Sequence, residues 1–121
     1  MNLLLYYLAA PYTHKLKYIV HRRVLEINRV VGELFHKGIF VFSPISASHP
    51  VLEVTNNLTG EWETWAAFDE IVIGKCDEFL ILTLDGWQES TGVNTETKIA
   101  KRLNKRISYV DPETCEIRDN P

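Results

Sequence analysis

The sequence predicts an α/β domain whose sheet has four or five parallel strands. Short apolar runs of strand length alternate along the chain with longer segments in which apolar residues recur every three or four positions. Such alternation is typical of a parallel sheet joined by right-handed crossover connections. At 121 residues the chain can bury one core but not two, so we expect one domain over residues 1–121.

The first strand and the first helix are predicted in the N-terminal third. Residues 3–9, "LLLYYLA", form a continuous apolar run that stops at Ala10 and Pro11, as a strand buried on both faces would. A helix is predicted over residues 13–38, with Gly38 as its end signal. The apolar positions of this helix are Leu16, Val20, Val24, Ile27, Val31 and Leu34.

A second strand and a long loop are predicted next. Residues 39–45, "IFVFSPI", favour a short strand broken at Pro44. Residues 46–60, "SASHPVLEVTNNLTG", have little periodicity and several turn formers, which predicts a loop. A loop of this length in a small domain is typically either a functional lid or a flexible segment.

The second half of the chain predicts two helices and two strands. Residues 61–76 indicate a helix, residues 78–84 a strand, residues 92–104 a helix and residues 106–110 a strand. The buried face of the first of these helices is predicted at Trp62, Trp65, Ala66, Val72, Ile73 and Cys76. The polar tail, "DPETCEIRDNP", is interpreted as a segment that reaches a neighbouring subunit or is frayed.

Two carboxylates lie on predicted apolar stripes. Asp69 lies on the inward face of its helix, and Glu96 lies between Val93 and Ala100 on another. An unpaired buried carboxylate is strongly unfavourable, so each position needs a reason. Glu96 either caps the first turn of its helix or faces a pocket, and Asp69 either pairs with an arginine of the first helix or faces that same pocket.

Three polar segments follow predicted strands and should meet at one edge of the sheet. They are "YLAAPYTH", "SPISASHP" and "DGWQESTGVNTE", and ligands of open α/β sheets bind where the strand order reverses at that edge. His14 and His49 lie beside strand ends and could contact a ligand, and Trp65 either stacks on a base or covers the core. Ser90, Thr91 and Gly92 precede a helix N-terminus, whose free N–H groups attract an anion.

Composition and charge exclude several classes of function. A net charge of −3 gives no electrostatic footprint for binding long nucleic acid, although positive residues are grouped in "HKLKYIVHRR" and leave a small anionic ligand possible. The apolar N-terminus is too short to span a membrane and lacks the basic start of a signal peptide. The two cysteines and four histidines lack metal-ligand spacing, so no metal site is expected. We expect a cytoplasmic protein whose partner is a small molecule.

The residues resemble those of the nucleoside 2-deoxyribosyltransferase superfamily over residues 7–100. The resemblance rests on "YYLAAPY", on Asp69 eight residues before Asp77 of "CDEFLIL", and on "STGVNTETKIA". The last segment is similar to the D/S-x-G-x-x-x-E-x-x-x-A pattern of that superfamily, with matches at Ser90, Gly92, Glu96 and Ala100. No single motif would be enough, but their order and spacing agree.

The resemblance implies a flavodoxin-like or Rossmann-like three-layer fold and cleavage of an N-glycosidic bond without metal or organic cofactor. Glu96 would be the nucleophile, Tyr7 would orient it, and Asp69 would help protonate the departing base. The substrate would be a nucleoside or its 5′-monophosphate, and a homo-oligomer is expected. From the resemblance and from their places in the sequence together, the expected substrate contacts are Ser90, Thr91, Gly92, Pro11, Ser43, His49 and Trp65.

The resemblance leaves the substrate open. The transferases carry an Asp six residues before the nucleophile, whereas the deoxynucleoside 5′-monophosphate N-glycosidases carry a Ser there, as Ser90 does here. That branch also has a Ser and an Arg just after the first strand, where this chain has Pro11 and Thr13. The pattern therefore favours a separate branch near the glycosidases. A non-catalytic nucleotide-binding or sensing module on the same fold is the alternative.

Overall fold

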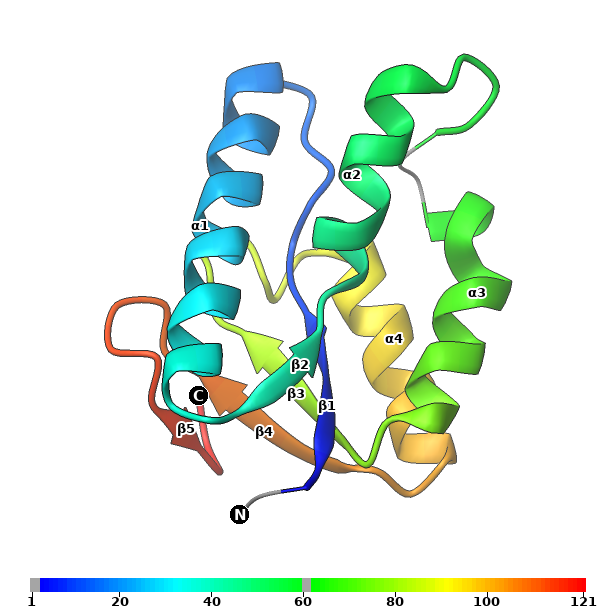
Figure 1. The fold of residues 1–121 in the computed structure, drawn as a ribbon. Coiled ribbons are helices and arrows are strands. Elements are labelled where there is room, and N and C mark those ends of the chain that lie inside the picture. The colour runs from blue at the N-terminus through cyan, green and yellow to red at the C-terminus, as the bar shows by residue number, and fades with distance from the viewer. Residues whose placement is uncertain (1–2, 60–61) are drawn as a thin grey trace.

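The computed structural model describes residues 3–59 and 62–121, with Trp62 described by its backbone alone. Figure 1 shows the elements along the chain. They are β1 (Leu5–Ala9), α1 (Lys17–His36), β2 (Phe40–Phe42), α2 (Pro44–Val54), α3 (Trp62–Lys75), β3 (Glu78–Leu82), α4 (Thr91–Arg102), β4 (Arg106–Val110) and β5 (Ile117–Arg118). None of the helices in these residues is long and apolar enough to cross a membrane.

The strands form one sheet in the order β2-β1-β3-β4-β5. The first four strands are parallel, which confirms the predicted α/β architecture. The fifth strand is antiparallel, because Asp111 accepts hydrogen bonds from the N–H groups of Glu113 and Thr114 and so forms a tight turn that sends the tail back along β4. The tail is therefore not frayed at Ile117–Arg118, because these residues pair with β4 of the same chain.

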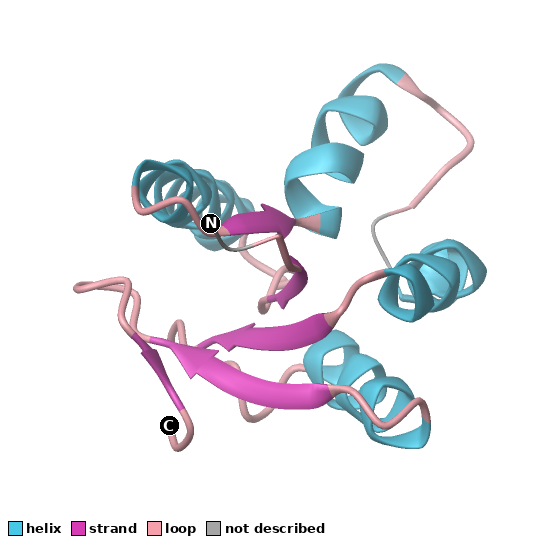
Figure 2. Cartoon of the chain, turned by 60° about the horizontal axis from the view of Figure 1, so that its bottom comes forward, coloured by secondary structure: helices cyan, strands magenta, loops and turns pink. Residues whose placement is uncertain are grey.

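Helices cover both faces of the sheet (Figure 2). The side chains of β1 alternate between the faces: Tyr6 and Leu8 pack in the core beneath α1, and Tyr7 and Ala9 pack in the core beneath α3 and α4. All four are buried, which explains why β1 has a continuous apolar sequence instead of an alternating one. The layers are thus helix, sheet and helix, as predicted.

The loop predicted at residues 46–60 is wrong in its first half, because α2 occupies Pro44–Val54. Ser43 caps this helix by accepting a hydrogen bond from the Ser46 N–H at 3.2 Å, and Pro44 occupies its start, where a missing N–H costs nothing. The helix could not be recognised in the sequence because Pro50 lies inside it and its buried residues, Pro44 and Ile45, are both at its start. A contact with α1, from the Ser46 hydroxyl to Asn28 Oδ1 at 2.6 Å, helps to hold α2 in place.

The other predicted elements agree with the structure to within a few residues. The helix α1 begins at Lys17, not residue 13, because the Leu16 N–H donates to the His14 ring at 3.0 Å and keeps the preceding chain out of the helix. It ends before Gly38, which has a φ of 76°, as its end signal predicted. The predicted burial of Trp62 concerns a side chain that lies outside the described part of the structure.

Candidate active site

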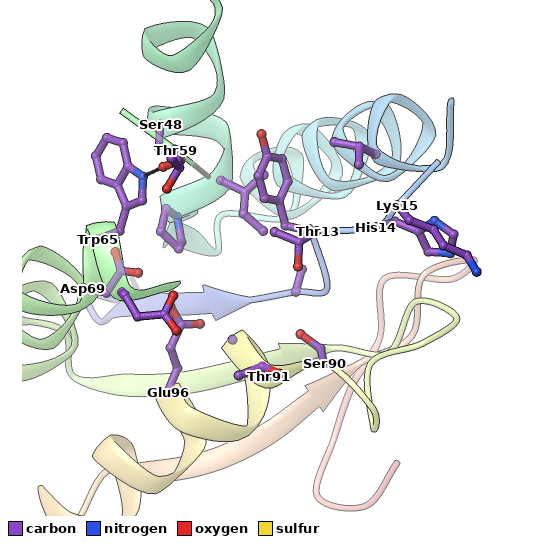
Figure 3. Close-up of a pocket in the computed structure, with 17 residues that line it drawn as sticks. Thr13, His14, Lys15, Ser48, Thr59, Trp65, Asp69, Ser90, Thr91 and Glu96 are labelled. Atoms are coloured by element: carbon purple, nitrogen blue, oxygen red, sulfur yellow. Dashed lines mark hydrogen bonds between the residues drawn. The ribbon is translucent and has the colours of Figure 1, made fainter. Parts of the chain in front are cut away.

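The topology places a cavity of about 820 Å³ beyond the carboxyl ends of β1 and β3. The connections from these adjacent strands run to opposite faces of the sheet, so this is the point where the strand order reverses. The volume is within the usual range for small-molecule sites. Its lining residues are Ala10, Tyr12, Thr13, His14, Lys15, Val20, Pro44, Ile45, Ser48, Thr59, Glu63, Trp65, Asp69, Ser90, Thr91, Gly92 and Glu96 (Figure 3).

A tyrosine and a glutamate meet at the floor of this cavity. Tyr7 is fully buried at the middle of β1, where its ring stacks on Phe79 at 5.5 Å between centroids. Its hydroxyl donates a hydrogen bond of 2.7 Å to Glu96 Oε2. Because the tyrosine is fixed by the sheet, it holds the carboxyl of Glu96 in one orientation.

Glu96 is not a helix cap. It is the sixth residue of α4 and therefore lies in the second turn, not in the first turn where the sequence placed it. Ser90 caps this helix instead, since its hydroxyl accepts from the Val93 N–H at 3.2 Å. Glu96 is only 6 % exposed, and it faces the cavity. Of the two interpretations of its position, the structure favours the pocket.

Asp69 approaches the same floor from α3. It is also 6 % exposed, and its Oδ1 atom is buried without a hydrogen-bond partner among the described residues. No described lysine or arginine pairs with it, so the predicted alternative of an ion pair with the first helix does not hold. Figure 3 shows Asp69 and Glu96 close together at one end of the cavity. An orphaned buried oxygen there is available to a ligand.

Burial raises the pKa of both carboxyl groups. The pKa of Glu96 lies well above its ordinary value because of its burial and because the neighbouring Asp69 carboxyl adds to the effect, while the hydrogen bond from Tyr7 opposes it. Burial likewise raises the pKa of Asp69, and its interaction with Glu96 partly offsets that rise. Two such groups titrate as a pair that readily holds a single proton. The pair thus supplies one acid and one carboxylate.

The far end of the cavity is polar and carries a positive charge. His14 and Lys15 lie on the loop after β1, away from Asp69, with Ser90 and Thr91 between them in Figure 3. Lys15 is the one lysine or arginine among the described lining residues. The opening N–H groups of α4 add a partial positive charge. This end can accommodate an anion.

The end near Asp69 is partly aromatic. Trp65 lines it, and the Trp65 indole N–H donates to the Thr59 carbonyl at 2.7 Å while its ring packs edge-to-face on Phe68 at 6.2 Å. Ser48 and Thr59 lie near Trp65 in Figure 3. A flat apolar ring beside hydrogen-bonding groups is suited to a heterocyclic base.

Most of the predicted site residues line the cavity. Glu96, Asp69, Ser90, Thr91, Gly92 and Trp65 do so, and Tyr7 reaches it through Glu96. Pro11, Ser43 and His49 are not among its lining residues. Pro11 is buried, Ser43 caps α2, and His49 lies 2.8 Å from the Tyr12 hydroxyl through its Nδ1 atom and 3.7 Å from the Glu53 carboxylate through Nε2.

Sequence reasoning missed several lining residues. Lys15 and Tyr12 follow the first strand directly, so their place at the carboxyl end of β1 was the signal that could have found them. Ser48 could not be predicted as a lining residue because it lies on α2, which was not recognised in the sequence. Within the described residues, no three His, Cys, Asp or Glu side chains are grouped to hold a metal.

Comparison with known proteins identifies the family. A family model described as "Domain of unknown function (DUF1937)" matches residues 5–111. A solved structure of a 2-deoxyribosyltransferase from the psychrotolerant bacterium Bacillus psychrosaccharolyticus is similar, with a TM-score of 0.57 and 22 % identity over 91 % of this chain and 74 % of that one. At that identity the similarity shows the flavodoxin-like fold. No match was found among curated proteins. The chain belongs to the DUF1937 family, which lies within the nucleoside 2-deoxyribosyltransferase-like superfamily that its motifs predicted.

Proposed function

We propose that this protein cleaves the N-glycosidic bond of a nucleoside or its 5′-monophosphate, with Glu96 as the nucleophile. The observation that carries the proposal is the 2.7 Å hydrogen bond from the Tyr7 hydroxyl to the buried Glu96 carboxyl, beside an Asp69 oxygen that has no hydrogen-bond partner among the described residues. A carboxylate held in one orientation next to a proton donor is the arrangement that a two-step glycosyl transfer needs. The family of the chain and its fold support the same chemistry.

The first step transfers the sugar to the protein. A Glu96 carboxylate oxygen attacks the anomeric carbon, a carbon–oxygen bond forms, and the bond from that carbon to the base nitrogen breaks. The proton that the two carboxyl groups share passes from Glu96 to Asp69 as Glu96 attacks. The electron pair of the broken bond leaves with the base, which takes that proton from Asp69. Tyr7 supports the attack because its hydrogen bond favours the charged form of Glu96.

The second step releases the sugar and restores the pair. Water, or a second base, attacks the same carbon and displaces the Glu96 carboxylate. The proton lost by the attacking water or base returns to Asp69, so one proton again belongs to the two carboxyl groups. With water the products are free base and free sugar, and with a second base the product is a new nucleoside.

The two ends of the cavity suggest how a substrate lies in it. A base would lie near Trp65 and Asp69, and a 5′-phosphate near Ser90, Thr91 and Lys15. Lys15 supplies a cation on the loop after β1, the segment in which the monophosphate glycosidases carry an Arg. A charge-assisted hydrogen bond there favours a monophosphate over a nucleoside.

Base release from a panel of nucleosides and deoxynucleoside monophosphates tests the proposal directly. Chromatography should detect free base from at least one compound with the wild-type protein, and Glu96→Ala should abolish the release. Glu89→Ala is the matched control, because Glu89 is an exposed glutamate of the loop just before α4 and should leave the rate unchanged. Activity retained in Glu96→Ala, or no release from any compound by the wild type, would contradict the proposal.

A further inference from the structure

We propose that Arg23 is a positioning residue that holds the two loops at the positively charged end of the cavity. The inference rests on the proposed function for its role in the reaction. Arg23 lies on α1 and is not a lining residue of the cavity. It forms no ion pair with a described carboxylate, so its donors are directed to backbone oxygens.

The guanidinium of Arg23 contacts both loops. Its Nη1 atom donates to the carbonyl oxygen of Thr13 at 2.8 Å and, at 3.4 Å, to that of Tyr12. Its Nη2 atom donates to the carbonyl oxygen of Asp85 at 3.4 Å. The planar fork of one arginine therefore joins the loop after β1 to the loop after β3.

Gly86 provides a second, independent observation. A Cβ atom at this position would lie 2.6 Å from Arg23 Nη2, closer than side-chain carbons approach. Gly86 also has a φ of 90°, which side-chain-bearing residues rarely adopt. The loop after β3 can approach the guanidinium this closely because the residue is glycine.

The two loops carry the groups that would contact the sugar and phosphate of a substrate. Thr13, His14 and Lys15 lie on the first loop, and the second leads to Ser90 and Thr91. Glu96 and Asp69 are instead fixed by their helices and by Tyr7 on the sheet. Loss of the Arg23 contacts should therefore weaken substrate binding and leave the chemistry of the carboxyl pair intact.

Arg23→Lys tests this role, because lysine keeps the positive charge but lacks the planar guanidinium that reaches both loops. We expect KM for the preferred substrate to rise about tenfold or more, with kcat within about twofold and an unchanged pH profile. Arg22→Lys is the matched control, since Arg22 is an exposed neighbour on the same helix and should change neither constant. A fall in kcat with KM unchanged, or a shifted pH profile, would overturn the proposal.

Gly86→Ala tests the same contact from the other loop. Alanine at position 86 strains the backbone whatever residue occupies position 23. Its Cβ atom clashes with the guanidinium only when that residue is arginine. The fold increase in KM of the double variant should therefore be smaller than the product of the fold increases of Gly86→Ala and Arg23→Lys. Fully multiplicative effects would show that the two residues are not coupled.

Amide hydrogen exchange separates this inference from the proposed function. Exchange over residues 12–16 and 85–90 should be faster in Arg23→Lys than in the wild type, and unchanged in Arg22→Lys. If the wild type releases no base, the proposed function fails, and this measurement alone decides whether Arg23 orders the loops. Unchanged exchange in Arg23→Lys would overturn the proposal whatever the activity.

Discussion

The hydrogen bond from Tyr7 to Glu96 links the core of the protein to its proposed chemistry. Tyr7 contributes its ring to the core and its hydroxyl to the cavity floor. Burial raises the pKa of Glu96, which opposes its role as a charged nucleophile, and the tyrosine partly offsets that rise. A single hydroxyl thus adjusts the pH at which the carboxylate forms.

Tyr7→Phe should move the acidic limb of the pH–activity profile to higher pH. Attack requires ionised Glu96, and loss of the hydrogen bond raises the pKa of this group further. As the solution is acidified, the variant should therefore lose activity at a higher pH than the wild type does. Well above this pH range the two proteins should differ less in activity. The measurement is kcat/KM against pH, with Tyr18→Phe as an exposed control. An unmoved limb would mean that Tyr7 does not act on the charge of Glu96.

Asp69→Asn should slow the reaction most for substrates whose base leaves poorly. A general acid typically contributes about 10²–10⁴-fold, and it matters least when the departing base needs no proton. The comparison is kcat/KM for natural and activated substrates in the variant and the wild type. An equal loss for both kinds of substrate would assign Asp69 a structural role.

Glu96→Gln should stabilise the fold increasingly as the pH rises. In the unfolded chain this glutamate ionises near its ordinary pKa of 4.5, whereas burial raises the pKa in the folded protein. Between the two values the unfolded state has lost a proton that the folded state keeps, so wild-type stability falls with pH by about 1.4 kcal/mol per unit. Glutamine removes the part of this dependence that belongs to Glu96, while the raised pKa of Asp69 still contributes in both proteins.

Denaturant unfolding between pH 5 and pH 8 measures the difference in stability between Glu96→Gln and the wild type. The difference should grow in favour of the variant as the pH rises, and exposed Glu89→Gln should show no such trend. A difference that stays constant or shrinks would show that the pKa of Glu96 is not raised in the folded protein.

At the scale of elements, periodicity predicted most of the fold. The strands β1, β3 and β4 and the helices α1 and α4 each have a clear apolar pattern, and α3 could be predicted from the apolar positions on either side of Asp69. The helix α2 contains Pro50 and buries Pro44 and Ile45 at its start, and it is specified by the cap at Ser43 and by contacts with other elements. The strand β5 is two residues long, too short to give a pattern, and depends on the turn that begins at Asp111.

The residues of the site also divide into those that a local sequence pattern indicates and those that depend on contacts between distant segments. Glu96 and Asp69 could be found because each interrupts an apolar stripe, a local property of the sequence. The contacts of Arg23 with two loops and of Tyr12 with His49 join residues distant in sequence, and they go to backbone atoms or depend on α2. No local pattern indicates such contacts.

The start of α4 allows a test of the 5′-phosphate. Ser90 and Ser43 cap α4 and α2 in the same way, but only Ser90 lines the cavity. If the Ser90 hydroxyl also donates to a phosphate, Ser90→Ala should lower the preference for monophosphate over nucleoside by about 1.5–3 kcal/mol. Ser43→Ala is the matched control, because it loses a cap of similar value and should keep the preference. An unchanged preference in Ser90→Ala would place the phosphate elsewhere.

At the scale of the whole molecule, the sheet order brings the parts of the site together. The strands β1 and β3 are adjacent, and α3 and α4 pack on the same face. Tyr7, Asp69 and Glu96 therefore converge although they come from three different elements. The homo-oligomer expected from the sequence stays a prediction, and exposed apolar side chains such as Leu25 and Phe35 on α1 are candidates for its interface.

Trapping the sugar on the protein is the most direct test of a covalent step at Glu96. A deoxynucleoside or deoxynucleotide that releases its base would be mixed with the protein, quenched in acid within one turnover, and digested for mass spectrometry. We expect a deoxyribosyl group on the peptide that contains Glu96, formed with a burst of free base, and no such group in Glu96→Gln. Sugar attached to another residue, or base release without any attached sugar, would contradict the role of Glu96 as the nucleophile.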